Sequence, residues 1–200
     1  MERFYFEVPT LEREKDAKEY VEEHLKYKSE IVGAGGLNRK YQEYTSWLEF
    51  LEDCKNRKKS NYAVPNRTYF LVRKSDNKII GMSNIRLELN QSLEYLGGHI
   101  GYGIRPTERR KGYNKINLYL GLKVCQKYGI KEAFLFSEST NIASWKTMED
   151  LGGKFIKEFF DDKIVKVNVK VYSFDVDKCL EDYKDIYQQY ILDDFIKGEW

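Results

Sequence analysis

Apolar and polar side chains alternate in several short segments of the chain. Successive side chains of a β-strand point to opposite faces, so this alternation predicts strands. Turn residues separate neighbouring segments: Ser75, Asp76 and Asn77 lie between two of them, and Asp161 and Asp162 between two others. Strands are therefore expected at residues 4–9, 69–73, 78–89, 93–104, 133–136, 155–160 and 163–174.

Other segments repeat their apolar residues at helical spacing, which places these residues on one face of a helix. Thr10 is a suitable cap for the first such segment, and Gly129 is a suitable end for the third. The glycine-rich residues 33–36 are expected to join the first two helices. Helices are expected at residues 10–25, 41–56 and 115–128, after Asn141, and from Val176 to near the terminus.

This order of elements predicts an α+β protein with a mixed, mostly antiparallel central sheet flanked by helices. The helix at residues 115–128 joins the strand ending at Ile104 to the strand at 133–136, so these two strands are expected to be parallel. We expect one main domain, residues 1–175. Residues 176–200 are expected to form an amphipathic C-terminal helix that packs on this domain or on a partner subunit, in a monomer or a homodimer.

Composition narrows the class of protein. Acidic and basic residues are interspersed and the net charge is +2, which argues against a general nucleic-acid or membrane binder. Three cysteines stand far apart, without the spacing of a zinc site or a disulfide framework, so a reducing compartment is expected. The charged N-terminus resembles no signal peptide, and no apolar run is long enough to span a membrane. A cytoplasmic location is the expectation.

The strongest local signal is the run Arg109-Arg-Lys-Gly-Tyr-Asn114, between a predicted strand and a predicted helix. The first N–H groups of a helix have no partner within the helix, and they attract anions. Gly112 allows a phosphate oxygen to approach the backbone closely. Residues 105–115 contain five basic side chains and one acidic one, Glu108. We therefore expect an anionic ligand here.

The spacing matches neither a P-loop nor the Gly-x-Gly-x-x-Gly motif of dinucleotide-binding folds. It resembles the Gln/Arg-x-x-Gly-x-Gly/Ala signature of the GNAT superfamily of N-acetyltransferases, with Arg109 first and Gly112 in the middle. Asn114 departs from the Gly or Ala of the last position, and its side chain would crowd the ligand or bond to it. Asn141 and the pair Gly152-Gly153 fit later family positions. The resemblance covers about residues 68–174.

The resemblance implies that acetyl-CoA is the co-substrate, that no metal is needed and that the parallel strand pair splays where the coenzyme enters. It also implies that the loop at residues 33–41 walls the acceptor site; a plain surface connection is the alternative. Implied coenzyme contacts are Ile104, Arg105, Arg109, Arg110, Lys111, Gly112, Tyr113, Asn114, Lys115, Asn141 and Ser144.

Acyl transfer to an amine requires an oxyanion donor, a base and an acid for the departing sulfur. By resemblance the oxyanion donor is a backbone N–H near residues 102–104. Gly101 and Gly103 fit either a strand bulge there or a close packing contact. His99 is the first candidate for the base, because it titrates near neutral pH and lies on the strand that precedes the basic run.

Other assignments stay open. Glu88 and Glu138 are the carboxylate alternatives for the base, and His24 is either a packed histidine or a substrate contact. Many family members have a tyrosine acid where this chain has Met148, which cannot donate a proton. Ser144 or Tyr102 would then supply the proton, or the thiolate would leave unassisted.

The sequence therefore predicts an N-acetyltransferase that moves the acetyl group of acetyl-CoA to a primary amine, on a small molecule, by direct attack in a ternary complex. No cysteine lies in a motif that suggests a covalent intermediate. The alternatives are a non-catalytic acyl-CoA-binding module of the same fold, a protein N-acetyltransferase, and a nucleic-acid binder that uses the basic turn on phosphates. The near-neutral net charge argues against the last of these.

Overall fold

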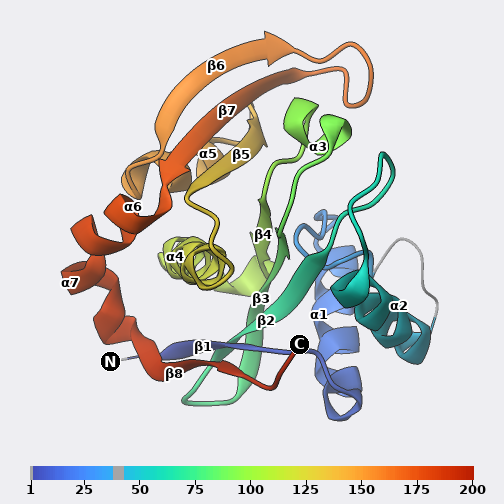
Figure 1. Cartoon of the computed structure of the whole chain (residues 1–200). Helices are drawn as coiled ribbons and strands as arrows, with labels where there is room; N and C mark the ends of the chain where they lie inside the picture. Colours follow the sequence, from blue (N-terminus) through green and yellow to red (C-terminus); the bar gives the residue numbers. More distant parts are fainter. Residues whose placement is uncertain (1, 38–42) are drawn as a thin grey trace.

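The computed structural model describes residues 2–37 and 43–200 and contains two sheets (Figure 1). The first has the strand order β4-β3-β2-β1-β8, and the second has the order β5-β7-β6. In the first sheet β1 pairs parallel with β8, and the other pairs are antiparallel. The strands are β1 (Phe4–Glu7), β2 (Asn66–Arg73), β3 (Lys78–Arg86), β4 (Ile100–Ile104), β5 (Glu132–Glu138), β6 (Lys154–Phe160), β7 (Asn168–Asp175) and β8 (Ile191–Lys197).

Helices cover both faces of the first sheet: α1 and α2 lie on one side and α4 on the other (Figure 1). The helices are α1 (Glu14–Lys26), α2 (Tyr44–Asn56), α3 (Gln91–Tyr95), α4 (Tyr113–Lys127), α5 (Ile142–Asp150), α6 (Val176–Asp182) and α7 (Lys184–Tyr187). Three short 3-10 turns add to them: η1 (Leu11–Arg13), η2 (Pro106–Glu108) and η3 (Gln188–Tyr190).

Strand alternation divides the interior into two hydrophobic clusters. On β1, Phe4 and Phe6 pack on the α4 side, and Tyr5 packs on the α1 and α2 side. On β2, Tyr69 packs on the α4 side and Phe70 packs on the α1 and α2 side. Both faces of the central strands are therefore buried, which explains why their sequences read as nearly continuous apolar runs.

A buried amide holds α4 against the sheet. Asn117 is fully buried on α4; its Oδ1 accepts a hydrogen bond from the Ser83 hydroxyl at 2.8 Å, and its Nδ2 donates to the carbonyls of Met82 and Gly103. Apolar residues on both sides of Asn117 fill the space against β3 and β4. These contacts fix the direction of α4, so its N-terminus lies at the end of β4.

The two sheets meet at the start of β4. The N–H of His99 donates to the carbonyl of Phe134 at 2.8 Å, and the N–H of Phe134 donates to the His99 ring Nδ1 at 3.0 Å. Beyond this joint β5 pairs with β7 rather than with β4. The strands after the joint therefore separate, as the predicted splay requires.

Most predicted elements are confirmed within a few residues, as is the α+β class. The prediction of one strand at 93–104 is wrong in its first half, because Asn90 caps α3 by accepting the Leu93 N–H. The C-terminal prediction is correct for α6 and α7 and wrong after them. Ile191–Lys197 forms β8, the parallel neighbour of β1, because its apolar residues pack on both clusters at the sheet edge.

No helix in residues 2–37 and 43–200 combines the length and apolar character that crossing a membrane requires. The three cysteines are buried and form no disulfide with one another, and burial raises the pKa of the Cys125 and Cys179 thiols to about 12.

The segment between α1 and α2 packs directly on β4. A Cβ built on Gly33 would lie 2.6 Å from the Gly101 carbonyl oxygen and 2.7 Å from that of Met82, and a Cβ on Gly103 would lie 3.0 Å from the Val32 oxygen. The β3–β4 register runs through Gly101 and Gly103 without a shift, so neither glycine marks a bulge. Gly103 serves close packing, whereas a Cβ on Gly101 would have only ordinary contacts, at 3.8 Å. Of the predicted acceptor loop, residues 38–41 lie outside the described residues.

Gly33→Ala tests this contact against Gly129→Ala. Both glycines have a positive φ, +78° and +76°, but a Cβ on Gly129 meets nothing within 4 Å. Gly129→Ala should cost about 1 kcal/mol from backbone strain alone. Gly33→Ala should cost a further ~2 kcal/mol or more, because two carbonyl groups must move. Urea denaturation measures both changes, and equal losses would show that the loop does not press on β4.

Candidate active site

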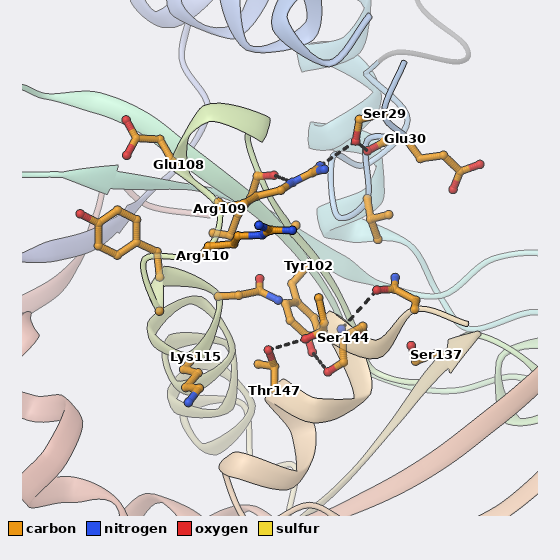
Figure 2. Close-up of a pocket in the computed structure, with 18 of the residues that line it drawn as sticks. Ser29, Glu30, Tyr102, Glu108, Arg109, Arg110, Lys115, Ser137, Ser144 and Thr147 are labelled. Carbon is orange, nitrogen blue, oxygen red and sulfur yellow. Dashed lines mark hydrogen bonds between the residues drawn. The ribbon is translucent and has the colours of Figure 1, made fainter. Parts of the chain in front are cut away.

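A cavity of about 660 Å³ opens where β4 and β5 separate. Its walls come from the end of α1 and the segment after it, from β4, from the turn before α4, from β5 and from α5 (Figure 2). The lining residues are His24, Ser29, Glu30, Val32, Tyr102, Gly103, Ile104, Glu108, Arg109, Arg110, Gly112, Tyr113, Asn114, Lys115, Phe136, Ser137, Glu138, Asn141, Ala143, Ser144 and Thr147.

The edge of β4 supplies backbone donors to this cavity. The N–H of Arg86 donates to the His99 carbonyl, and the N–H of Arg105 donates to that of Ile80. In an antiparallel pair hydrogen-bonded positions alternate, so the intervening N–H groups of Tyr102 and Ile104 point away from β3. They face the gap that β5 leaves, where an extended ligand with carbonyl groups would take the place of a neighbouring strand.

At the other end of the cavity lies the turn that starts α4. Gly112 is the N-cap, in a left-handed conformation with φ +81°. A Cβ added there would meet no atom within 4 Å, so φ, and not a steric contact within the protein, explains the glycine. Arg110 also has a positive φ, +62°. Such alternation of backbone conformations turns successive N–H groups toward one point, which suits an anion.

Two arginines of this turn line the cavity (Figure 2). The Nε of Arg109 donates to the Ile104 carbonyl at 3.0 Å, and its terminal nitrogen donates to the Ser29 hydroxyl at 2.6 Å. Arg109 thereby ties the segment after α1 to the end of β4. In Figure 2 the side chain of Arg110 extends beside that of Arg109, above Tyr102.

Glu108 holds the turn before α4 in place through ion pairs with basic residues. It is 4% exposed and accepts hydrogen bonds from Arg73, Lys78 and Lys111. Burial alone would raise the pKa of this carboxyl, but the hydrogen bonds from Lys111 and Arg73 outweigh it and lower the pKa to about 2. Glu108 is therefore ionised at neutral pH and holds Lys111 away from the cavity.

The first turn of α4 adds two polar side chains. The Oδ1 of Asn114 is buried and has no hydrogen-bond partner among the described residues. An amide can turn so that its nitrogen faces an anion, so Asn114 offers the ligand a contact and does not simply narrow the site. Lys115 forms an ion pair with Asp150 of α5 at 2.7 Å, which joins the two helices that border the cavity.

The opposite wall is the start of α5. Asn141 caps this helix by accepting the Ser144 N–H at 3.2 Å. The Tyr102 hydroxyl lies 3.4 Å from the Ser144 carbonyl, and burial raises the pKa of that tyrosine. The Thr147 hydroxyl donates to the Ala143 carbonyl at 2.7 Å. Met148 is 1% exposed and packs in the hydrophobic cluster on the α4 side, so it does not reach the cavity.

The structure brings most of the predicted coenzyme residues together. The predicted residues that line the cavity are Ile104, Arg109, Arg110, Gly112, Tyr113, Asn114, Lys115, Asn141 and Ser144. Arg105 and Lys111 do not line it. Arg105 is buried, with its guanidinium bonded to Glu23 and to the Ile79 carbonyl, so it fastens α1 to the sheet. The Lys111 ammonium is paired with Glu108.

Two predicted catalytic residues, His99 and Glu88, lie elsewhere. They line a second cavity of about 510 Å³ together with Lys59, Glu94 and Phe134. The His99 Nδ1 accepts the Phe134 N–H, so the neutral ring carries its proton on Nε2 and has no free lone pair. Burial lowers its pKa to about 4. This geometry is that of a joint between strands, and it conflicts with the prediction of His99 as a base.

Several lining residues were not among the predicted coenzyme or catalytic residues. His24, Ser29, Glu30 and Val32 precede the predicted acceptor loop, and the described residues 33–37 do not line the cavity. The helical spacing around His24 was only a weak indication that this residue contacts a substrate. No local pattern marks Ser29 or Glu30, because their position depends on how the segment after α1 folds over β4. The described residues contain no group of three or more His, Cys, Asp or Glu that could hold a metal.

Comparisons with known proteins agree with this arrangement. The model of the acetyltransferase (GNAT) family matches residues 41–152. No curated protein matches the chain by sequence. Among solved structures, the spermidine/spermine N-acetyltransferase SpeG from Vibrio cholerae has a TM-score of 0.64 at 12% identity, over 90% of this chain and 98% of that one.

Two further structures were solved with acetyl-CoA. The microcin C7 self-immunity acetyltransferase MccE, in complex with acetyl-CoA and AMP, has a TM-score of 0.61 at 17% identity, over 86% of this chain and 92% of that one. YncA from Salmonella typhimurium, with its cofactor acetyl-CoA, has a TM-score of 0.58 at 14% identity, over 88% of this chain and 95% of that one. At these identities the likeness concerns the fold.

Glu108→Gln tests the anchor of the turn. The folded-state pKa lies below the ordinary value of 4.5, so the stabilisation by Glu108 is complete above that value and disappears as the pH falls toward 2. The variant should be less stable at neutral pH by about 2 kcal/mol, after allowance for solvent screening of the lysines. The difference should close between about pH 4.5 and pH 2.

Urea denaturation at a series of pH values measures this difference. The exposed Glu132 at the start of β5 is the control, and Glu132→Gln should leave stability nearly unchanged. A constant difference between Glu108→Gln and the unmodified protein at every pH would contradict the ion-pair interpretation.

Proposed function

Since the chain belongs to the GNAT acetyltransferase family, we propose that it transfers the acetyl group of acetyl-CoA to a primary amine on a small molecule. The amine attacks the thioester directly in a ternary complex. The observation that carries this proposal is the continuous cavity from the free edge of β4 to the N-terminus of α4. One end suits a thioester arm and the other end suits a diphosphate.

The diphosphate of the coenzyme binds at the turn before α4. The N–H groups around Gly112 and the positive end of the α4 dipole attract it, and the Arg110 side chain adds a positive charge. Arg109 contributes charge while it holds Ser29. The partial charges and the arginines act together in a partly enclosed site, where electrostatic attraction is stronger than in water.

The pantetheine arm lies along β4, between that strand and α5. The N–H groups of Tyr102 and Ile104 bind its carbonyl groups and that of the thioester, and one of them stabilises the oxyanion that forms during attack. In this assignment the oxyanion donor is an N–H of a free strand edge and needs no bulge, which was one of the two alternatives for Gly101 and Gly103.

The leaving group is the thiolate of coenzyme A. Tyr102 and Ser144 both line the cavity and each carries a hydroxyl, so either of them is a candidate to return a proton to the sulfur. Their presence favours an enzyme over a non-catalytic acyl-CoA-binding module. Met148 at the usual tyrosine position is the feature that keeps the non-catalytic alternative open, and turnover with an amine decides between the two.

The acceptor is a cationic amine. Glu30 and Glu138 stand at the cavity on the segment after α1 and at the end of β5, and their carboxylates would attract an ammonium group. The similar protein SpeG is a spermidine/spermine N-acetyltransferase, which makes spermidine a rational first acceptor to test. A peptide N-terminus remains the alternative substrate.

Gly112→Glu tests coenzyme binding, and Gly129→Glu is its matched control. Both glycines flank α4, both have φ near +80°, and neither would bring a Cβ within 4 Å of another atom. The two variants therefore share the same backbone strain and the same added charge. Only Gly112→Glu places the charge at the diphosphate, so its Kd for acetyl-CoA should rise about 100-fold or more.

Isothermal titration calorimetry with acetyl-CoA measures these constants. Gly129→Glu should stay within about threefold of the unmodified protein, because the added charge lies at the far end of the helix. Equal weakening in both variants, or tight binding by Gly112→Glu, would place the diphosphate elsewhere.

An amine panel tests the acceptor class. The release of free coenzyme A from acetyl-CoA should be faster with spermidine or propylamine than with a short peptide that has a free N-terminus, by about tenfold or more in kcat/KM. A preference for the peptide would support the protein N-acetyltransferase. No release with any amine, together with tight binding of acetyl-CoA, would support the non-catalytic module.

A further inference from the structure

His24 has an unusual position at the cavity. It belongs to the last turn of α1, is 1% exposed, and is one of the residues that line the cavity. Its Nδ1 lies 2.9 Å from the Tyr20 carbonyl oxygen. Its Nε2 is buried and has no hydrogen-bond partner among the described residues.

The backbone contact fixes the tautomer of this ring. A carbonyl oxygen can only accept, so Nδ1 must carry the proton that bonds to Tyr20. In the neutral ring Nε2 therefore has a free lone pair. His99 shows the reverse arrangement, because its Nδ1 accepts a backbone N–H. Of the two histidines in the chain, His24 is the one that the fold prepares to accept a proton.

The surroundings keep the ring neutral. Burial is the main cause of a lowered pKa for His24, and the positive charges of Arg109 and Arg105 lower it further. The Tyr20 carbonyl and the Glu23 carboxylate act in the opposite direction. The charge of Glu23 is largely satisfied by Arg105 and by the N–H and hydroxyl of Thr107.

An unpaired acceptor in a buried place costs stability, since it has lost its hydrogen bond to water. The Tyr20 ring packs against His24 with centroids 4.4 Å apart and offers no hydrogen bond to Nε2. A ligand in the cavity that brings a donor would remove this cost. Acetyl-CoA and an amine are the ligands of the proposed function, and the attacking nitrogen is the donor that must lose a proton.

We propose that His24 is the general base of the reaction, with Nε2 accepting the proton of the attacking amine. This inference rests on the proposed function. As the neutral amine forms its bond to the thioester carbon, the nitrogen becomes positively charged and transfers a proton to Nε2. The carbon–sulfur bond then breaks, the sulfur leaves as a thiolate, and the imidazolium proton returns to it through Tyr102, Ser144 or water. The products are the acetamide and free coenzyme A, and the ring is neutral again.

The pH dependence of kcat/KM with spermidine tests this role. The amine must be neutral to attack, which gives a slope of about 1 in the logarithm against pH below the amine pKa. A base that must also be unprotonated adds a second unit of slope below its own pKa. As the pH rises, the slope of log kcat/KM for the unmodified enzyme should therefore fall from about 2 to about 1. This break should lie below pH 6.5, the ordinary pKa of histidine.

His24→Gln should lower kcat/KM about 100-fold and give the single slope throughout, because glutamine does not titrate. His99→Gln is the matched control, since it removes the other histidine and disturbs the joint between the sheets. It should lower the melting temperature while the break in slope stays in place. A break that survives in His24→Gln, or one that disappears in His99→Gln, would overturn the assignment.

Chemical rescue separates catalysis from packing. His24→Ala leaves space at the cavity, so added imidazole should restore activity in proportion to its neutral fraction. The Kd for acetyl-CoA should stay within about threefold of the unmodified value, because the one hydrogen bond of the ring among the described residues goes to the Tyr20 carbonyl and not to the turn before α4. An inactive His24→Ala that binds acetyl-CoA normally and gains nothing from imidazole would contradict a base at this position.

One measurement needs neither variants nor turnover. Nitrogen NMR of the labelled histidines in the unmodified protein should show His24 protonated on Nδ1. Addition of coenzyme A and spermidine, which form a complex without an acetyl group, should shift the Nε2 signal of His24 and leave that of His99 in place. A ring protonated on Nε2, or an unchanged signal, would refute the role of His24 while the family's acetyl transfer could still be observed.

Discussion

The hydrogen bonds between His99 and Phe134 are the constraint on which the site depends. They hold β4 and β5 together at one point, and the strands then enter different sheets. Beyond that point the backbone groups of β4 that face away from β3 have no neighbouring strand, although a buried strand edge requires partners. An extended ligand with amide and thioester groups can supply these partners. The backbone bond from His99 to Phe134 thus positions the edge of the binding site, and the His99 ring strengthens this joint without lining the cavity.

The second requirement is that a helix begins where this edge ends. The apolar rows of α4 bury it between the sheets, and Asn117 fixes its register through contacts to both β3 and β4. The turn before α4 is kept open by Glu108, which holds Lys111 and two other cations on its own side. Without this carboxylate, repulsion among the basic residues would oppose the compact turn. Stability of the turn and affinity for an anion therefore come from different side chains.

Local patterns predicted the parts of the site that local interactions create. Gly112 and the arginines before it form a turn whose geometry follows from neighbouring residues, and Asn141 caps the helix that it precedes. Residues that approach through tertiary packing were harder to predict. The sequence placed His99 beside the strand that leads to the basic run, but its separation from the cavity depends on where β5 departs from β4.

His24 is a second residue whose role depends on tertiary packing and could not be predicted from its local sequence. Its apolar surroundings in α1 indicated a packed residue, which is correct for most of the ring, while the free Nε2 depends on the turn of α1 above β4. The C-terminal strand was missed because the spacing of its apolar residues continues that of the helices before it. Only the presence of β1 as a neighbour distinguishes strand from helix there.

β8 also determines how the sheet ends on the side away from the cavity. It covers β1, which is almost wholly apolar and would otherwise be an exposed template for pairing with another chain. In its place β8 presents the adjacent carboxylates of Asp193 and Asp194, both exposed. A second copy of the chain that added its own β8 there would bring like charges together. In the folded protein β8 therefore opposes edge-to-edge pairing between copies of the chain.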